Sequence, residues 1–212
     1  MTSSTITGAI LSGGPNSLIF GKAKSGLRVG NGSLIDRQVR IMREICSEII
    51  VVTDNPLQLM DNLDPKVRLI TDYFTECGPV GGIHAALNLA RHPFVWIVGC
   101  DMPFISTEVT RRLIQNRAEK YDALIPITQK HLFPLHGLYR KNCADKITRM
   151  LESKETTKEQ FLERMDWLGI EMDNLINKQG IDDFTYVIQS EDDLKHAQEL
   201  LDQRLCFGEI QE

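Results

Sequence analysis

The chain has 212 residues, a formal net charge of −5 and an apolar content of 42%, which is enough for one substantial core and predicts a single domain over residues 1–212. The acidic balance argues against a nucleic-acid partner, and no apolar run is long enough to predict a membrane partner. The five cysteines are scattered without a C-x-x-C pair, and the first residues lack the features of a signal peptide, so free thiols and a cytoplasmic location are expected.

The first 125 residues alternate short apolar runs with amphipathic stretches. Five apolar runs predict buried strands, at 6–11, 49–52, 67–70, 94–98 and 123–125. The stretches between them predict helices at 33–46, 57–63, 83–90 and 107–119, with Ser33 as an N-cap. This alternation predicts an α/β fold with a doubly wound, mainly parallel, Rossmann-like sheet in a three-layer α/β/α arrangement.

The last third of the chain is less regular. A short strand is expected at 133–139, a helix at 141–151, and a weak helix at 161–165 within the polar segment 152–183. A final strand, which could be antiparallel at an edge, is expected at 184–188, followed by a closing amphipathic helix at 192–205.

Two glycine-rich segments follow predicted strands. In the first, Gly13 and Gly14 precede a proline, which predicts a turn whose backbone N–H groups suit phosphate or carboxylate. The spacing to the following lysines excludes a Walker loop, and the dinucleotide fingerprint G-x-G-x-x-G is absent. The second segment, starting at Gly78, opens a helix whose free N–H groups also favour an anion. An ordinary turn of an α/β domain is the alternative for the first segment.

In parallel sheets of this class, ligands bind at the carboxyl ends of the strands. That rule brings six predicted site residues to one edge: Gly13, Gly14, Thr53, Asp72, Gly78 and Asp101. Asp101 follows the most apolar strand, and a carboxylate there suits Mg²⁺, which takes one or two carboxylates and completes its shell with water and phosphates. The structural alternatives to these site roles are a helix cap or a turn for Asp101 and a turn for Asp72. Lys24, which follows the first glycine segment, would neutralise charge on a transferred phosphate group, and its alternative is a solvated surface position. Cys100 is expected to pack in the interior, and His131 and His136 are each expected to be structural or on the surface.

With these residues in place, the chain resembles the molybdenum cofactor guanylyltransferases, nucleotidyltransferases of the glycosyltransferase-A-like (nucleotide-diphospho-sugar transferase) fold. The segment 10–14, Ile-Leu-Ser-Gly-Gly, is similar to the family's L-A-G-G loop, and Lys24 stands at the spacing of its signature lysine. The segment 78–83 is similar to G-P-L-A-G-M, and 100–103, Cys-Asp-Met-Pro, is similar to the C-D-T-P metal motif. The resemblance covers roughly residues 5–140, with a weaker echo at 184–194.

The resemblance implies transfer of GMP from GTP to molybdopterin, with pyrophosphate as the other product. It implies Lys24 and Asp101 as catalytic residues, Asp101 as the ligand of a Mg²⁺ cofactor, and further maturation proteins as partners. The implied nucleotide-binding residues are Leu11, Ser12, Gly13, Gly14, Lys24, Thr53, Asp72, Gly78 and Asp101.

The chain departs from the family pattern at three places, one of which is Thr53, where relatives often have Asn. Residues 18–20 are Leu-Ile-Phe where relatives carry Arg-Met-Gly, so a phosphate-binding arginine is missing. The family's closing N-x-N-T-P segment appears as 187–191, Val-Ile-Gln-Ser-Glu, without either asparagine. Two alternatives therefore accompany the guanylyltransferase hypothesis: a related nucleotidyltransferase that uses CTP or a sugar phosphate, and a non-catalytic homologue that binds nucleotide or a maturation partner.

Overall fold

The computed structural model describes residues 6–14, 18–19, 22–23, 26–30, 32–60, 63–74, 77–173 and 184–206. The strands in this part are β1 (Ile6–Leu11), β2 (Leu18–Ile19), β3 (Lys22–Ala23), β4 (Arg28–Val29), β5 (Gly32–Ser33), β6 (Cys46–Val52), β7 (Arg68–Ile70), β8 (Phe94–Gly99), β9 (Ala123–Thr128), β10 (His131–Leu132), β11 (Leu138–Arg140) and β12 (Trp167–Glu171). The helices are α1 (Leu34–Met42), α2 (Leu57–Met60), α3 (Gly78–Leu89), α4 (Thr107–Gln115), α5 (Ala144–Glu152), α6 (Lys158–Arg164) and α8 (Glu191–Cys206), with a 3₁₀ turn at Lys141–Cys143.

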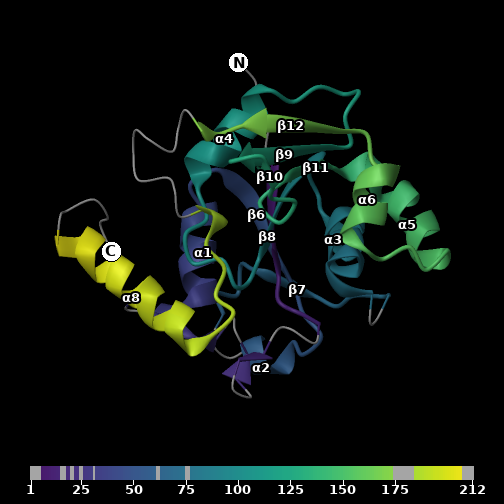
Figure 1. Ribbon diagram of the computed structural model, residues 1–212. Coiled ribbons are helices and arrows are strands. Elements are labelled where there is room, and N and C mark those ends of the chain that lie inside the picture. Colours follow the sequence, from purple (N-terminus) through teal and green to yellow (C-terminus); the bar gives the residue numbers. More distant parts are fainter. Residues whose placement is uncertain are drawn as a thin grey trace.

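The main sheet has the strand order β10-β9-β11-β8-β1-β6-β7, with β12 paired to β9. The strands β8, β1, β6 and β7 all run parallel, and the antiparallel β11 is inserted between β8 and β9. The chain thus winds outward from β1 in both directions. This confirms the predicted mainly parallel, doubly wound sheet and places the carboxyl ends of β1, β6, β7 and β8 at one edge, which α2 marks in Figure 1.

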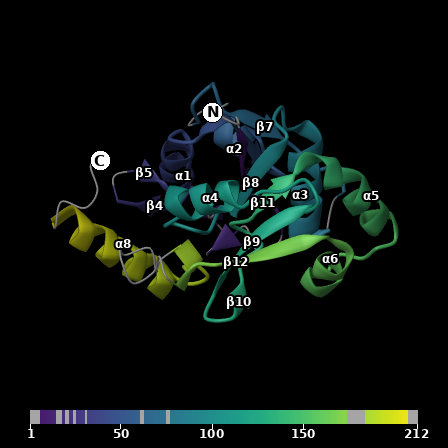
Figure 2. The ribbon, with the colours of Figure 1, turned by 90° about the horizontal axis from the view of Figure 1, so that it is seen from above.

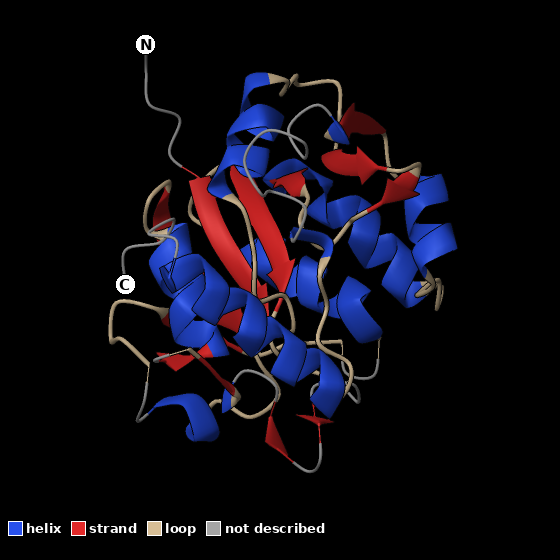
Figure 3. Ribbon diagram, turned by 60° about the vertical axis from the view of Figure 1, so that its left-hand side comes forward, coloured by secondary structure: helices blue, strands red, loops and turns tan. Residues whose placement is uncertain are grey.

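Helices cover both faces of the sheet, because successive strand residues point to opposite sides. Along β1, Ile10 belongs to the core formed with α1 and α4, whereas Ala9 belongs to the core formed with α3, α5 and α6. Trp96 and Ile97 of β8 divide between the two cores in the same way. Figures 1 and 3 show the resulting three layers.

A third, smaller core lies under the C-terminal helix α8. Ala197 and Leu201 of α8 pack with Val29 of β4 and Leu34 at the start of α1. The Gln198 side chain donates a hydrogen bond to the Arg28 carbonyl at 3.1 Å, so the helix is held against the β4–β5 hairpin (Figure 2).

Local signals explain where several helices begin. The Ser33 side chain accepts from the Asp36 N–H and caps α1, as expected. Ser106 caps α4 in the same way, and Thr157 with Gln160 forms a capping box at α6. None of the helices in the described ranges combines the length and the apolar character that crossing a membrane would require.

The structure corrects three expectations in the second half of the chain. The segment 184–188 is not a strand: it forms a short 3₁₀ turn and extended coil. Of the predicted strand 133–139, only residues 138 and 139 are in a strand, where they belong to β11, and β10 ends just before the predicted segment. The strand β12 lies within 152–183, the polar segment for which only a weak helix was expected, and it pairs in parallel with β9.

Candidate active site

The loop after β1 lies between the ends of two neighbouring strands. The Ser12 N–H donates to the Val52 carbonyl of β6 at 2.8 Å, and the Leu11 carbonyl accepts from Cys100 after β8 at 2.9 Å. Gly14 has a φ of +87°, a backbone conformation that glycine adopts without strain. These contacts fix Leu11, Ser12, Gly13 and Gly14 at the predicted edge.

Asp54, a residue outside the predicted set, holds this loop from the end of β6. Its carboxylate accepts a hydrogen bond from the Gly14 N–H. A Cβ on Gly13 would lie only 2.8 Å from Asp54 Oδ1, so the carboxylate packs directly on the glycine backbone. The signal in the sequence is the polar segment 53–56, which directly follows the predicted strand 49–52.

Thr53 lies at the same edge but is almost fully buried. Its hydroxyl accepts from the Asn55 N–H at 3.2 Å, so the side chain stabilises the turn that presents Asp54. A contact between Thr53 and nucleotide stays a prediction.

Asp72 connects the end of β7 to the start of α3. Its Oδ1 accepts from the Phe74 N–H at 2.9 Å. A Cβ on Gly81 would lie 2.2 Å from Asp72 Oδ2, so only glycine allows the helix to approach this carboxylate. Burial raises the pKa of Asp72, and nearby Asp54 adds to the rise, whereas the Phe74 hydrogen bond and His84 oppose it.

The N-terminal turn of α3 faces the β1 loop. Gly78 has a φ of +58°, and Pro79 stands in the first turn, where it sacrifices no helical hydrogen bond. A Cβ on Gly82 would come within 3.3 Å of the Leu11 side chain, so α3 lies close against the end of β1. The positive end of the helix dipole therefore lies beside the glycine loop.

Asp101 lies directly after β8, and its side chain is partly exposed. A Cβ on Gly99 would lie 2.6 Å from Asp101 Oδ1, so this carboxylate folds back over the end of the strand. The Asp101 carbonyl accepts from the Ile188 N–H at 2.9 Å, which brings the divergent segment 187–191 to this edge. Cys100 is buried beside it, as expected.

The donor set at Asp101 fits a hard divalent cation. Among the described residues, no group of three or more His, Cys, Asp or Glu side chains could hold a metal ion. Mg²⁺ does not need such a group, because one carboxylate oxygen, water and substrate phosphates fill its shell. A single accessible carboxylate beside two anion-favouring backbone segments meets that requirement.

The described residues exclude Lys24 and include only part of the divergent segment 18–20. Lys24 lies outside the described residues, so its roles in catalysis and nucleotide binding stay predictions. The divergent Leu18 and Ile19 form β2, which pairs with β3. His136 is structural, as expected: it is fully buried, and its Nε2 accepts from the Ser106 N–H at 3.0 Å.

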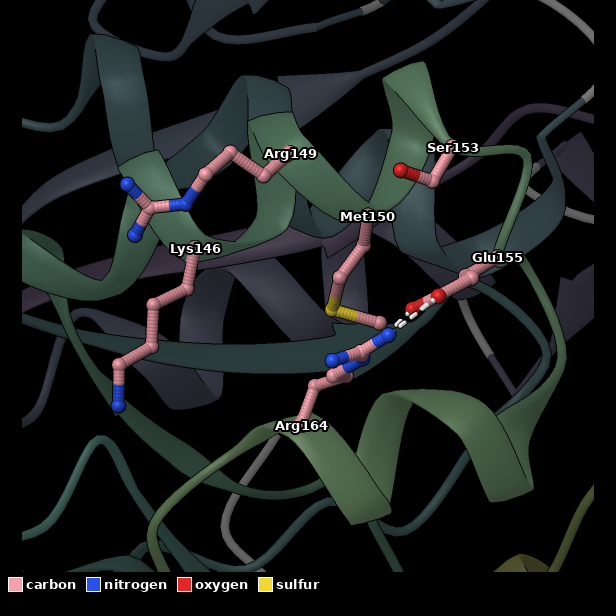
Figure 4. A pocket seen from close by; sticks show the side chains of 6 residues that line it. All are labelled: Lys146, Arg149, Met150, Ser153, Glu155 and Arg164. Carbon is pink, nitrogen blue, oxygen red and sulfur yellow. Dashed lines mark hydrogen bonds and ion pairs between the residues drawn. The ribbon is translucent and has the colours of Figure 1, made fainter.

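A cavity of about 320 Å³ lies elsewhere, between α5 and α6 (Figure 4). Its cations are already largely paired: Lys146 contacts Asp122 and Asp166 at 2.6 Å, and Arg164 binds both carboxylate oxygens of Glu155. Asp122 lies at the amino end of β9, which runs parallel to β8. The cavity therefore lies toward the edge opposite Asp101 and is not part of the candidate site.

Comparison with known families agrees with the arrangement of this edge. Residues 8–168 match the model of the MobA-like NTP transferase domain. The chain belongs to this family. The matched span runs from the strand before the glycine loop through Asp101 to β12, so it contains every described site residue named above. A MobA-like domain accounts for the order of strand, glycine loop and Cys-Asp-x-Pro turn.

Curated relatives support the same assignment, and a solved structure shows the same fold. A protein of Pelotomaculum thermopropionicum named "Probable molybdenum cofactor guanylyltransferase" is 36% identical over 150 residues, 69% of each chain. A "Molybdenum cofactor guanylyltransferase" of Desulfosudis oleivorans is 33% identical over 147 residues, 69% of this chain and 71% of the relative. The structure of molybdopterin-guanine dinucleotide biosynthesis protein A from Archaeoglobus fulgidus has a TM-score of 0.79 at 24% identity, covering 93% and 99% of the two chains.

The MobA-like fold is shared more widely. The structure of CMP:2-keto-3-deoxy-manno-octonic acid synthetase complexed with CTP has a TM-score of 0.72 over 95% of this chain and all of the other. At 11% sequence identity this likeness shows the fold alone. It confirms the nucleotide-diphospho-sugar transferase architecture. Which nucleotide binds depends on the residues of the site, because the fold is shared by enzymes that use different nucleotides.

Proposed function

We propose that this MobA-like protein transfers GMP from GTP to molybdopterin. The observation that carries the proposal is the edge where the β1 loop, the start of α3 and Asp101 meet. Membership of the family and relatives named as molybdenum cofactor guanylyltransferases support the choice of donor and acceptor. The cytoplasm is the proposed compartment, supported by four free cysteines among the described residues.

The reaction exchanges one phosphorus–oxygen bond for another. An oxygen of the terminal phosphate of molybdopterin attacks the α-phosphorus of GTP. The bond from that phosphorus to the bridging oxygen breaks, and pyrophosphate leaves with the electron pair. Such a transfer needs alignment of three phosphates and neutralisation of their charge more than it needs covalent help.

The backbone of this chain supplies part of that alignment. The start of α3 directs its free N–H groups and dipole toward the β1 loop, which favours bound phosphate. Within the β1 loop, the N–H groups of Ser12 and Gly14 are already bonded to Val52 and Asp54. The Gly13 N–H has no acceptor among the described residues and is the loop donor that a nucleotide can use directly.

Asp101 would hold Mg²⁺, and Lys24 would contact phosphate. When bound, the ion neutralises charge on the phosphates and helps to orient them. The role of Asp101 is to place a carboxylate oxygen at the edge, and the backbone hydrogen bond from Ile188 fixes the residue that carries it. Both roles are proposals based on the family pattern and the accessible position of the carboxylate.

The divergent residues 18–20 favour one alternative, a homologue that binds nucleotide or a maturation partner without turnover. A charge-assisted contact of the missing arginine is worth roughly 1.5–3 kcal/mol, or about ten- to a hundredfold. Lys22, in β3, is a neighbouring cation, but lysine does not provide the bidentate fork of arginine. A loss of this size slows an enzyme without abolishing its reaction, so we keep transfer as the proposed function.

The test is calorimetric titration with GTP and CTP, each with and without Mg²⁺, followed by a pyrophosphate-release assay with molybdopterin. We expect GTP to bind more tightly than CTP, with Mg²⁺ strengthening binding, and pyrophosphate to appear. Preference for CTP would be compatible with the same fold, but the transferred group would then be CMP and not GMP. Binding without stoichiometric pyrophosphate release would establish the non-catalytic homologue instead.

A further inference from the structure

Helix α1 places two consecutive side chains against the turn that carries Asp101. Gln38 Nε2 donates to the carbonyls of Gly99 and Met102, each at 2.8 Å. Arg37 Nε donates to the Pro103 carbonyl at 2.9 Å. The two carbonyls bound by Gln38 flank Asp101 on both sides, so one amide group spans the turn.

The burial and orientation of Gln38 show that this contact is specific. The side chain is fully buried on a helix face otherwise formed by apolar residues such as Ile35, Val39 and Met42. Its orientation is fixed, because the reversed amide would place Oε1 against two carbonyl oxygens. Oε1 itself has no hydrogen-bond partner among the described residues. Burying an amide whose oxygen is unpaired costs free energy. What the side chain provides in return is the pair of hydrogen bonds from Nε2 to the turn, which an apolar side chain could not make.

The Asp101 carboxylate lies over the same turn. Asp101 Oδ1 lies over Gly99, since a Cβ there would be 2.6 Å away. The Gly99 carbonyl is held by Gln38, the Asp101 carbonyl by the Ile188 N–H, and the Met102 carbonyl again by Gln38. Carbonyl groups before, at and after Asp101 are therefore held by hydrogen bonds from α1 and from the segment preceding α8.

We propose that Gln38 is a positioning residue, whose buried amide sets the Asp101 carboxylate in the orientation that binds the metal–nucleotide complex. The inference rests on the proposed function, because it takes Asp101 as the metal ligand. Gln38 does not touch substrate. It acts by preventing the 99–102 turn from relaxing, and partners of this kind typically change metal affinity or activity ten- to a hundredfold.

The experiment compares Gln38→Met, which keeps the volume and removes both donors, with Val39→Ala. Val39 is the next residue of the same helix, and it is buried in the core that also holds Cys100 and Met102. Its apolar side chain makes no hydrogen bond to the turn, so truncation removes packing and leaves the hydrogen bonds of Gln38 in place. The metal probe is Mn²⁺, titrated by electron paramagnetic resonance into protein saturated with the non-transferable α,β-methylene analogue of GTP. Pyrophosphate release gives kcat and KM, and thermal unfolding gives stability.

We expect Gln38→Met to weaken Mn²⁺ affinity and to lower kcat by about tenfold each, with the KM for GTP within about threefold of wild type. Val39→Ala is expected to lower Tm while leaving Mn²⁺ affinity and kcat within about twofold. Equal effects of the two variants on Mn²⁺ affinity and kcat would overturn the role of Gln38, provided that Asp101→Asn still abolishes Mn²⁺ binding. Wild-type protein that neither binds Mn²⁺ with the analogue nor releases pyrophosphate would overturn the proposed function and this inference together.

A measurement on the wild-type protein keeps the proposal testable if Gln38→Met does not fold. The Gln38 side-chain amide should exchange its protons slowly in ¹⁵N-labelled protein, because both are bonded and inaccessible. Exchange as fast as that of the exposed Gln203 would show that the bracing hydrogen bonds are not maintained in solution, and would overturn the inference.

Discussion

The Asp54 carboxylate accepts a hydrogen bond from the backbone N–H of Gly14, and its oxygens also pack on the backbone of Gly13. The contact joins the turn after β6 to the loop after β1, forty residues apart in sequence. It uses one of the N–H groups that a nucleotide could otherwise bind. The shape of the loop is therefore set by an acidic side chain before any ligand arrives.

Asp54→Ala should loosen this loop. Loss of a hydrogen bond to a charged group is worth roughly 1.5–3 kcal/mol, so we expect the dissociation constant for GTP to rise about tenfold or more. The control is Asp64→Ala, which removes an aspartate that pairs with Arg43 before the amino end of β7. Calorimetry should show unchanged GTP binding in the control. Equal binding in both variants would remove Asp54 from the candidate site.

Asp101→Asn should abolish transfer without unfolding the chain. The amide keeps the size of the side chain but loses the charge that suits Mg²⁺, and we expect pyrophosphate release to fall by roughly a hundredfold or more. Asp166→Asn, at the cavity between α5 and α6, removes an exposed carboxylate paired with Lys146 and should keep full activity. Circular dichroism and Tm should match wild type for Asp101→Asn. Full activity in that variant would disprove the metal role.

Gly81→Ala tests the approach of α3 to Asp72. The added methyl would lie 2.2 Å from Asp72 Oδ2 and 2.8 Å from the Phe74 carbonyl, so backbone and carboxylate must both move. We expect the free energy of unfolding to fall by about 1–3 kcal/mol, as in other overpacked sites, and GTP binding to weaken. Gly26→Ala is the control, because no atom of the described part of the chain lies within 4 Å of its added Cβ. Urea titration and calorimetry measure the two effects, and a Gly81 variant as stable as the control would contradict the close approach of α3 to Asp72.

His136 should make stability depend on pH. Burial lowers its pKa from 6.5 to about 4, so the folded protein keeps it neutral while the unfolded chain binds a proton. Its contribution is therefore fully present above about pH 6.5 and is lost as the pH falls toward 4, by roughly 3 kcal/mol in total. Urea titrations between pH 7.5 and 4.5 should show this slope, and His136→Gln should flatten it. An unchanged slope in that variant would assign the effect to other groups.

The sequence alone was sufficient for the central sheet and for the position of most described site residues. Apolar runs such as 94–98 are long and uniform enough to predict buried strands, and the rule that ligands bind at the carboxyl ends then places Asp72 and Asp101 together. Asp54 was missed because an aspartate in a polar turn has no local mark of its own. Its role depends on the Gly14 N–H, which only the pairing of β1 with β6 brings near.

The last third shows where local pattern fails. Residues 184–188 read as a strand because they are apolar, yet Phe184 and Ile188 are buried against His136 and the α8 core, with no strand partner among the described residues. Conversely, β12 has a weak pattern and contains Gly169, where a Cβ would lie 2.2 Å from Ile127 Cδ1. Its strand conformation comes from pairing with β9, which no local propensity could predict.

The sequence alone predicts the fold class, the edge at which we propose that a ligand binds, and the family pattern that names Lys24 and Asp101, because apolar periodicity and glycine turns act over short stretches of chain. The tertiary structure decided how that edge is held: Asp54 on the β1 loop, Gly81 beneath Asp72, and Gln38 across the Asp101 turn. These contacts join residues that are 9 positions apart (Asp72 and Gly81), 40 apart (Gly14 and Asp54) and 61 or 64 apart (Gln38 and the Asp101 turn). Hydrogen bonds and close packing over such separations exist only once the sheet has formed.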